Sequence, residues 1–154
     1  MTPESIQFYI VETFADIVPK DRWGETSFFV NPEGRFAHGA YFATIKRKDG
    51  ENDSASGLDR DGVWRLNFGL TPSSFKSLFG PRPARPAKGR TIEGDWDFTA
   101  LDTLTPHPVY GWMGWVSVNC LSASTFESCK PLLQDAYGKA VATLQRRMTN
   151  KASA

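Results

Sequence analysis

The sequence predicts an α+β domain in which an antiparallel sheet packs against N- and C-terminal helices. Apolar residues recur at helical spacing near both ends of the chain, over residues 6–14 and 126–144. Between them lie short β-rich segments separated by turns, without the strand–helix alternation that builds a parallel sheet. A chain of 154 residues suits one domain, which we place at residues 1–148, with a disordered tail at 149–154.

The first helix is predicted from its starting signal. Thr2 can cap free backbone N–H groups, and Pro3 occupies a position where its missing N–H costs nothing. The apolar repeat continues to Phe14, and the helix should end before Pro19.

Three strands are expected in the next part of the chain. Residues 25–30 and 41–45 are rich in β-formers and flank a turn at 31–34 that contains proline and glycine. Residues 48–62 are almost all polar and should form an exposed loop. Residues 63–68 alternate between apolar and polar side chains, the pattern of a half-buried strand.

The C-terminal half should contain a short helix, a strand and a long helix. Thr71 and Pro72 repeat the helix-start pattern, and Gly80 suits the end of that helix. The segment at 96–104 looks irregular, with one short strand at most, whereas 115–120 alternates as a strand. Ser122 or Ser124 should cap the long helix, and Pro131 should either kink it or mark a later start.

Composition and spacing give no support for a metal or a cofactor. The only histidines are His38 and His107, and neither has a second ligand at a metal-binding spacing. Cys120 and Cys129 do not form a zinc-binding pair, and the glycines match no phosphate-binding loop. We therefore predict no metal site and no bound cofactor.

The densest group of unusual residues lies at 106–115, just before a predicted strand. This segment contains His107, Tyr110 and Trp112, together with prolines and glycines. The simpler interpretation is that these rings cover the end of the sheet. The alternative is a ligand pocket, to which Arg65 and Asn67 could add polar groups, with His107 as an acid or base.

A basic loop at residues 81–94 is the one place where nucleic acid could dock. The net charge is only +1, so no overall field attracts polyanions, and phosphate contacts would need this local patch. Such loops more often serve solubility, so nucleic acid is possible but not favoured. The cations concerned are Arg82, Arg85, Lys88 and Arg90.

Location is expected to be cytoplasmic, without membrane association. The first residues lack the basic start and uninterrupted apolar run of a secretory signal, and no segment has the apolar length of a membrane span. Two cysteines are too few for a disulfide framework.

Several stretches resemble an uncharacterised bacterial family of domains of unknown function. The main motifs are LDRDGVWRLN and PHPVYGWMGWV, and the layout is similar to that of the MmcQ/YjbR-like proteins. The resemblance implies a CyaY-like α+β fold and no established activity, with nucleic-acid binding only suggested for the wider group. The chain departs from that group at the 81–94 loop and in the acidic loop before Leu58.

Three classes of function remain open. A non-enzymatic binding or adaptor module, with a protein or small-molecule partner, is our first expectation because it needs the fewest special residues. The alternatives are a small-molecule enzyme or sensor using the His107–Trp112 segment, and a nucleic-acid-associated protein using the basic loop. Whether the protein catalyses any reaction stays open.

Overall fold

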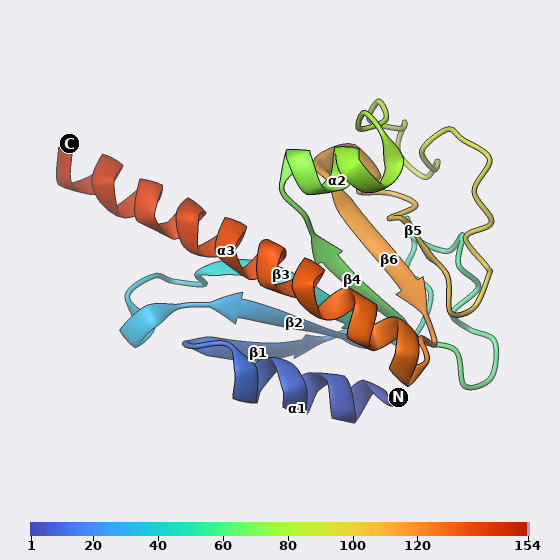
Figure 1. Ribbon diagram of the computed structural model, residues 1–154, viewed down its shortest axis with the longest axis horizontal. Helices are drawn as coiled ribbons and strands as arrows, with labels where there is room; N and C mark the ends of the chain where they lie inside the picture. The colour runs from blue at the N-terminus through green and yellow to red at the C-terminus, as the bar shows by residue number, and fades with distance from the viewer. Residues whose placement is uncertain (154) are drawn as a thin grey trace.

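The computed structural model describes residues 1–153, which form an open antiparallel sheet with three helices (Figure 1). The six strands lie in the order β1-β2-β3-β4-β6-β5, and the predicted α+β class is confirmed. The strands are β1 (Ile17–Arg22), β2 (Glu25–Val30), β3 (Ala40–Lys46), β4 (Arg65–Gly69), β5 (Leu104–Pro106) and β6 (Trp115–Asn119). The helices are α1 (Pro3–Thr13), α2 (Pro72–Phe79) and α3 (Ala123–Ser153), with 3₁₀ turns at Pro32–Gly34 and Gly111–Met113.

The hydrophobic core lies between the sheet and the helices. Helix α3 crosses β2, β3 and β4, and α1 lies beside β1 (Figure 1). Alternate strand residues such as Leu66 and Phe68 of β4 are fully buried on this face, because successive side chains of a strand point to opposite faces. Ile6, Ile10 and Leu133 complete the core from the helices.

The predicted helix starts are confirmed. The Thr2 hydroxyl accepts a hydrogen bond from the Ser5 amide at 3.1 Å, and Thr71 caps α2 by accepting from the Ser74 amide at 3.3 Å. Each cap satisfies one of the free amides of the first helical turn. Gly80 ends α2 at a φ of +82°, a conformation that glycine adopts at little cost.

Helix α3 begins at Ala123, before Pro131, so Pro131 does not mark its start. The Ser122 hydroxyl accepts from the Thr125 amide at 3.2 Å, and the helix passes through Pro131 without a new start. The later start is therefore wrong. The helix continues over 149–153, where the sequence predicted a disordered tail; residue 154 lies outside the described part. Over the residues described, no helix has both the length and the apolar character to cross a bilayer.

The two edge strands were not predicted as such. Strand β1 follows α1 directly and contains Pro19, whereas β5 is a strand of three residues that ends at Pro106. Each pairs with a neighbour on one side only. Proline cannot donate a hydrogen bond to a sheet, and within sheets it is therefore found mainly in edge strands. Pro19, which the sequence analysis used only as the limit of the first helix, thus lies in an edge strand.

The second face of the sheet carries polar side chains, but it is not fully open to solvent. Residues 48–62 were expected to form an exposed loop; in the structure Ser56 and Leu58 are each 1% exposed. This loop lies against the polar side of β4, where Arg65 is fully buried. The physical reason is the pairing of Arg65 with Asp53 of the loop, which polarity alone does not predict.

Candidate ligand-binding site

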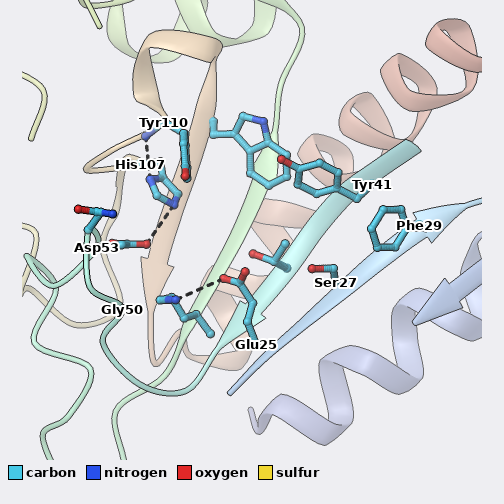
Figure 2. A pocket seen from close by; sticks show the side chains of 12 residues that line it. Glu25, Ser27, Phe29, Tyr41, Gly50, Asp53, His107 and Tyr110 are labelled. Atoms are coloured by element: carbon cyan, nitrogen blue, oxygen red, sulfur yellow. Dashed lines mark hydrogen bonds and ion pairs between the residues drawn. The ribbon is translucent and has the colours of Figure 1, made fainter. Parts of the chain in front are cut away.

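A cavity of about 340 Å³ opens on the polar face of the sheet (Figure 2). Strands β2 and β3 form its floor, and residues 50–53 and 107–110 form its sides. Its volume lies in the range of small-molecule sites in proteins. The aromatic residues that line it are Phe29, Tyr41, Tyr110 and Trp115, and the ionisable residues are Glu25, Lys46, Asp53 and His107.

Three of the aromatic rings form a continuous row across the sheet. The Tyr41 ring centroid lies 5.6 Å from that of Phe29 and 5.2 Å from that of Trp115. The Trp115 ring lies over Gly69 of β4, where a Cβ atom would come within 2.7 Å of the indole. The missing side chain at Gly69 therefore lets the indole lie flat against the strand. We call Phe29, Tyr41 and Trp115 the aromatic row.

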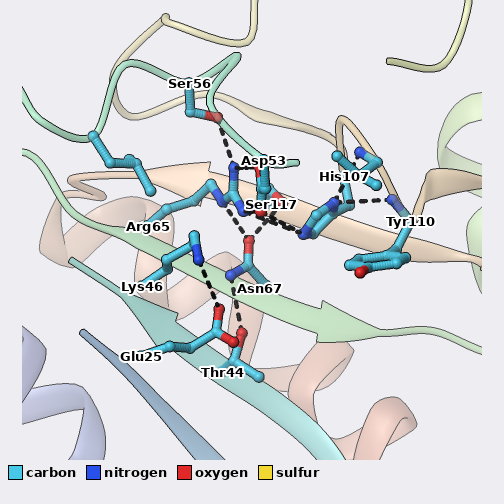
Figure 3. A network of polar contacts seen from close by, with 12 residues as sticks. Glu25, Thr44, Lys46, Asp53, Ser56, Arg65, Asn67, His107, Tyr110 and Ser117 are labelled. Carbon is cyan, nitrogen blue, oxygen red and sulfur yellow. Dashed lines mark hydrogen bonds and ion pairs between the residues drawn. The ribbon is translucent and has the colours of Figure 1, made fainter. Parts of the chain in front are cut away.

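A buried arginine supports one side of the cavity (Figure 3). Four N–H groups of Arg65 reach oxygen acceptors: Nε donates to Asn67 Oδ1 at 2.7 Å, Nη1 donates to Asp53 Oδ1 and to Ser56 Oγ, and Nη2 donates to Asp53 Oδ2. The fifth faces His107 Nε2 at 3.2 Å. Four of these N–H groups are bonded to oxygens and the fifth lies against the buried His107 ring, so Arg65 holds the site together and presents no N–H group to the cavity.

The Asp53 carboxylate stays ionised in this setting. Burial alone would raise its pKa, but the hydrogen bonds and charge of Arg65 outweigh burial and hold the pKa below its usual value. A two-point carboxylate–guanidinium pair of this kind fixes geometry as well as charge. The pair thereby fastens residues 48–62 to β4.

A second set of hydrogen bonds ties the strands together beneath the cavity. Asn67 Nδ2 donates to Thr44 Oγ1 at 2.9 Å, and Ser117 Oγ donates to Asn67 Oδ1 at 2.7 Å. Strands β3, β4 and β6 are thus linked through side chains as well as through the backbone. Buried polar groups that are satisfied in this way rigidify a site.

His107 is buried and held neutral. Its Nδ1 accepts hydrogen bonds from the backbone N–H groups of Val109 and Tyr110, each at 3.0 Å. A neutral imidazole carries one N–H, so these contacts assign the proton to Nε2, which lies 3.7 Å from Asp53 Oδ2. Burial, reinforced by the charge of Arg65, lowers the pKa of His107 to about 3.

Other polar groups of the cavity are free to meet a ligand. The hydroxyl groups of Tyr41 and Tyr110 turn toward the cavity (Figure 2), and within residues 1–153 neither has a hydrogen-bond partner. Burial raises the pKa of Tyr41, as do the nearby Tyr110 and Glu25. Burial also raises the pKa of Glu25, whose carboxylate lies 3.9 Å from Lys46 Nζ.

The structure separates the residues that the sequence had grouped around His107. His107 and Tyr110 line the cavity, whereas Arg65 and Asn67 lie beneath it with their polar groups engaged. Trp112 is not among the lining residues, and its ring packs against the Arg85 guanidinium at 4.8 Å. Sequence reasoning missed Glu25, Tyr41, Lys46, Asp53 and Trp115.

The cations of the basic loop make different contacts with the rest of the chain. Arg85 packs on Trp112, and Arg82 lies close enough to Lys139 of α3 to contribute to lowering its pKa. The Arg90 amide donates to the Ala87 carbonyl in a local turn. Arg85 and Arg90 both line a hollow of about 640 Å³ within the loop, together with Glu93.

Fold and cavity together define an α+β protein whose open antiparallel sheet packs helices on one face and shapes a ligand-sized cavity on the other. The family model described as "Family of unknown function (DUF6194)" matches residues 1–149, so the chain belongs to DUF6194. Searches of the curated proteins and of the solved structures each gave no match.

Proposed function

We propose that this protein is a non-enzymatic binding module whose ligand is a small molecule held in the cavity on the polar face of the sheet. The observation that carries the proposal is the pair of phenol hydroxyls of Tyr41 and Tyr110, which face an open cavity without partners in the described chain. Aromatic walls with a few convergent polar groups are typical of small-molecule sites.

Binding is favoured over catalysis by the state of the ionisable groups. With a pKa of about 3, His107 is neutral at pH 7 and a weak base. Its Nδ1 lone pair is already occupied by two backbone N–H groups. Asp53 is bound to Arg65 at both carboxylate oxygens. These groups support a preorganised binding surface rather than proton transfer.

The test is a thermal-shift screen of metabolites against the wild-type protein and a Tyr41→Phe/Tyr110→Phe variant. A ligand that binds only the native state raises the melting temperature, with a stabilisation of about 2.7 kcal/mol at a hundred times its Kd. The double variant keeps both rings and loses both hydroxyls. We expect it to weaken binding about tenfold or more, the effect of losing hydrogen bonds worth about 1 kcal/mol each.

Tyr9→Phe is the matched control. Tyr9 packs against Phe126 beside the hydrophobic core, away from the cavity, so its hydroxyl should not affect the ligand. Equal melting shifts in the wild type, the double variant and the control would show that the ligand binds elsewhere, and would contradict the proposal.

An adaptor role, nucleic-acid binding and a relationship to the MmcQ/YjbR-like proteins are further proposals. An adaptor role would need an apolar patch, and the most exposed large apolar side chains, Phe8 and Trp23, are 69% and 77% exposed on α1 and on the β1–β2 turn. Nucleic-acid binding would rest on the basic loop alone. The MmcQ/YjbR-like relationship is supported by the helices at both ends that back an antiparallel sheet, and cytoplasmic location stays a prediction.

A further inference from the structure

A second cavity, of about 520 Å³, adjoins the first at the end of the sheet. Phe29, Tyr41 and Trp115, the aromatic row, line both cavities. The second cavity continues past these rings to α3, where it meets Lys139 and Arg147. A ligand that lies on the aromatic row can therefore extend from one cavity into the other. We call the second cavity the basic groove.

The groove carries positive charge without acidic residues. Lys139, Thr143 and Arg147 follow one another at four-residue intervals, so they lie along one face of α3. His38 and Arg22 add further basic groups to the lining, which contains no aspartate or glutamate. Among residues 1–153, no carboxylate lies within 4.0 Å of Arg22, Lys139 or Arg147.

The two central cations are held by backbone carbonyls. Lys139 Nζ donates to the Leu70 carbonyl at 3.0 Å, and Arg147 Nη1 donates to the Gly39 carbonyl at 3.1 Å. Each retains further N–H groups. Burial lowers the pKa of Lys139 and the charge of Arg82 lowers it further, and the Asp135 carboxylate compensates for this only in part, because burial penalises the charged form. An anion in the groove would offset this cost.

Small residues leave room for such an anion. Ala136 and Ala140 line the groove on either side of Lys139, and Gly39 lines it from the segment before β3. Gly39 has a φ of +82°, and a Cβ atom there would lie 2.2 Å from the Val30 carbonyl oxygen. A side chain at this position would therefore displace the backbone that holds Arg147.

We infer that the ligand of this protein is a planar aromatic compound with an anionic group, whose ring lies on the aromatic row and whose phosphate or carboxylate lies in the basic groove between Lys139 and Arg147. The inference rests on the proposed function, because the ring occupies the cavity already described. Arginine and lysine bind both kinds of anion through charge-assisted hydrogen bonds.

The test compares charged and neutral members of two ligand pairs by isothermal titration calorimetry. Adenosine 5′-monophosphate is paired with adenosine, and indole-3-acetate is paired with indole-3-acetamide, so that the two kinds of anion are distinguished. We expect the charged member of at least one pair to bind about tenfold or more tightly than its neutral partner. Lys139→Gln/Arg147→Gln should abolish that preference.

The control variant Arg146→Gln/Lys151→Gln removes the same charge from the same helix at exposed positions outside the groove. It should retain the preference, as should Arg147→Lys, which keeps the charge. Circular dichroism checks that each variant is folded. An equal loss in the control would show that only the overall charge matters, and would overturn the inference.

The outcomes separate this inference from the proposed function. If the neutral compounds bind as tightly as the charged ones, and Tyr41→Phe/Tyr110→Phe weakens both, the cavity binds ligands but the groove does not select anions. If no probe binds and inorganic phosphate leaves the NMR resonances of Lys139 and Arg147 unchanged, the inference fails, and the thermal-shift screen still decides the proposed function.

Discussion

Burial and the groups around the His107 ring make a doubly protonated ring costly. Two backbone N–H groups occupy Nδ1, and Arg65 lies 3.2 Å from Nε2. Only Asp53 offers a negative charge, and that charge is shared with Arg65. Protonation of His107 should therefore destabilise the folded state.

The cost of protonating His107 predicts a loss of stability in mild acid. The pKa of His107 is about 3 in the folded protein and about 6.5 in an unfolded chain, so the unfolded state binds more protons between these values. Stability falls as the pH drops through this window, by about 2 kcal/mol between pH 7 and pH 5. Urea unfolding at several pH values measures the loss.

His107→Asn is the matched variant for that experiment. The asparagine Oδ1 can accept from the same backbone N–H groups as Nδ1, but it does not titrate. The free energy of unfolding of the variant should lack the His107 contribution, while all other titrating groups stay the same. Parallel pH profiles for the two proteins would contradict the buried neutral histidine.

The Arg65–Asp53 pair should show a large coupling energy. Arg65→Met leaves the Asp53 carboxylate without its partner and should cost about 3–5 kcal/mol, the usual cost of breaking a buried ion pair. Adding Asp53→Asn should recover part of this loss, because the unpaired charge is gone. A double-mutant cycle measured by chemical denaturation gives the coupling.

The exposed pair Lys130–Glu127 on α3 provides the comparison. An exposed ion pair is screened by water and salt, so the cycle of Lys130→Met and Glu127→Gln should give a much smaller coupling. Similar values for the two cycles would mean that Arg65 is less isolated from solvent than its surroundings indicate.

Only part of the cavity could be predicted at the level of residues. His107 and Tyr110 lie in a segment dense in rings and prolines, so the sequence singled them out. Glu25, Tyr41 and Lys46 occupy polar positions of ordinary strands, where a side chain usually faces solvent. Their role depends on which segments cover that face, and residue spacing within one strand does not contain this information.

At the level of elements, the clearest dependence is that of Trp115 on Gly69. The indole packs over the glycine, and a Cβ atom there would lie 2.7 Å from two ring atoms. Gly69→Ala should therefore displace the ring and destabilise the protein by about 1–3 kcal/mol. It should also change the near-ultraviolet circular dichroism and weaken any ligand that lies on the aromatic row.

Gly138→Ala is the control for the same chemical change. Gly138 lies within α3, with nothing within 4 Å of an added Cβ atom. Because glycine is less favourable than alanine inside a helix, this substitution should raise stability by up to about 1 kcal/mol. Destabilisation by both substitutions would mean that the effect at Gly69 does not come from contact with the indole.

Elements with a starting signal of their own could be predicted, and elements defined by their neighbours could not. The caps at Thr2 and Thr71 and the long helix from Ser122 are local features. Strand β1 has no such signal: five of its six residues are exposed, and it exists because β2 pairs with it. Strand β5 likewise depends on β6.

At the level of the whole molecule, the fold class could be predicted from the sequence. The packing of residues 48–62 over the polar face of the sheet could not. Helical periodicity at both ends, with strands between, suffices for an α+β sheet backed by helices. The covering of the second face depends on the ion pair between Asp53 and Arg65, two residues of opposite charge that lie twelve positions apart. Nothing local distinguishes Asp53 from the other acidic residues of the loop.

The two edge strands give the molecule a further property. An open sheet exposes unpaired N–H and C=O groups along its outermost strands, where a second chain can add and begin a fibril. Here Pro19 interrupts one edge and Pro106 ends the other. Lys20 adds a charge to the first edge. Each proline removes a donor that an incoming strand would need, and Thr105 and Pro106 of β5 are buried as well, so the sheet can keep two unpaired edges with little tendency to aggregate.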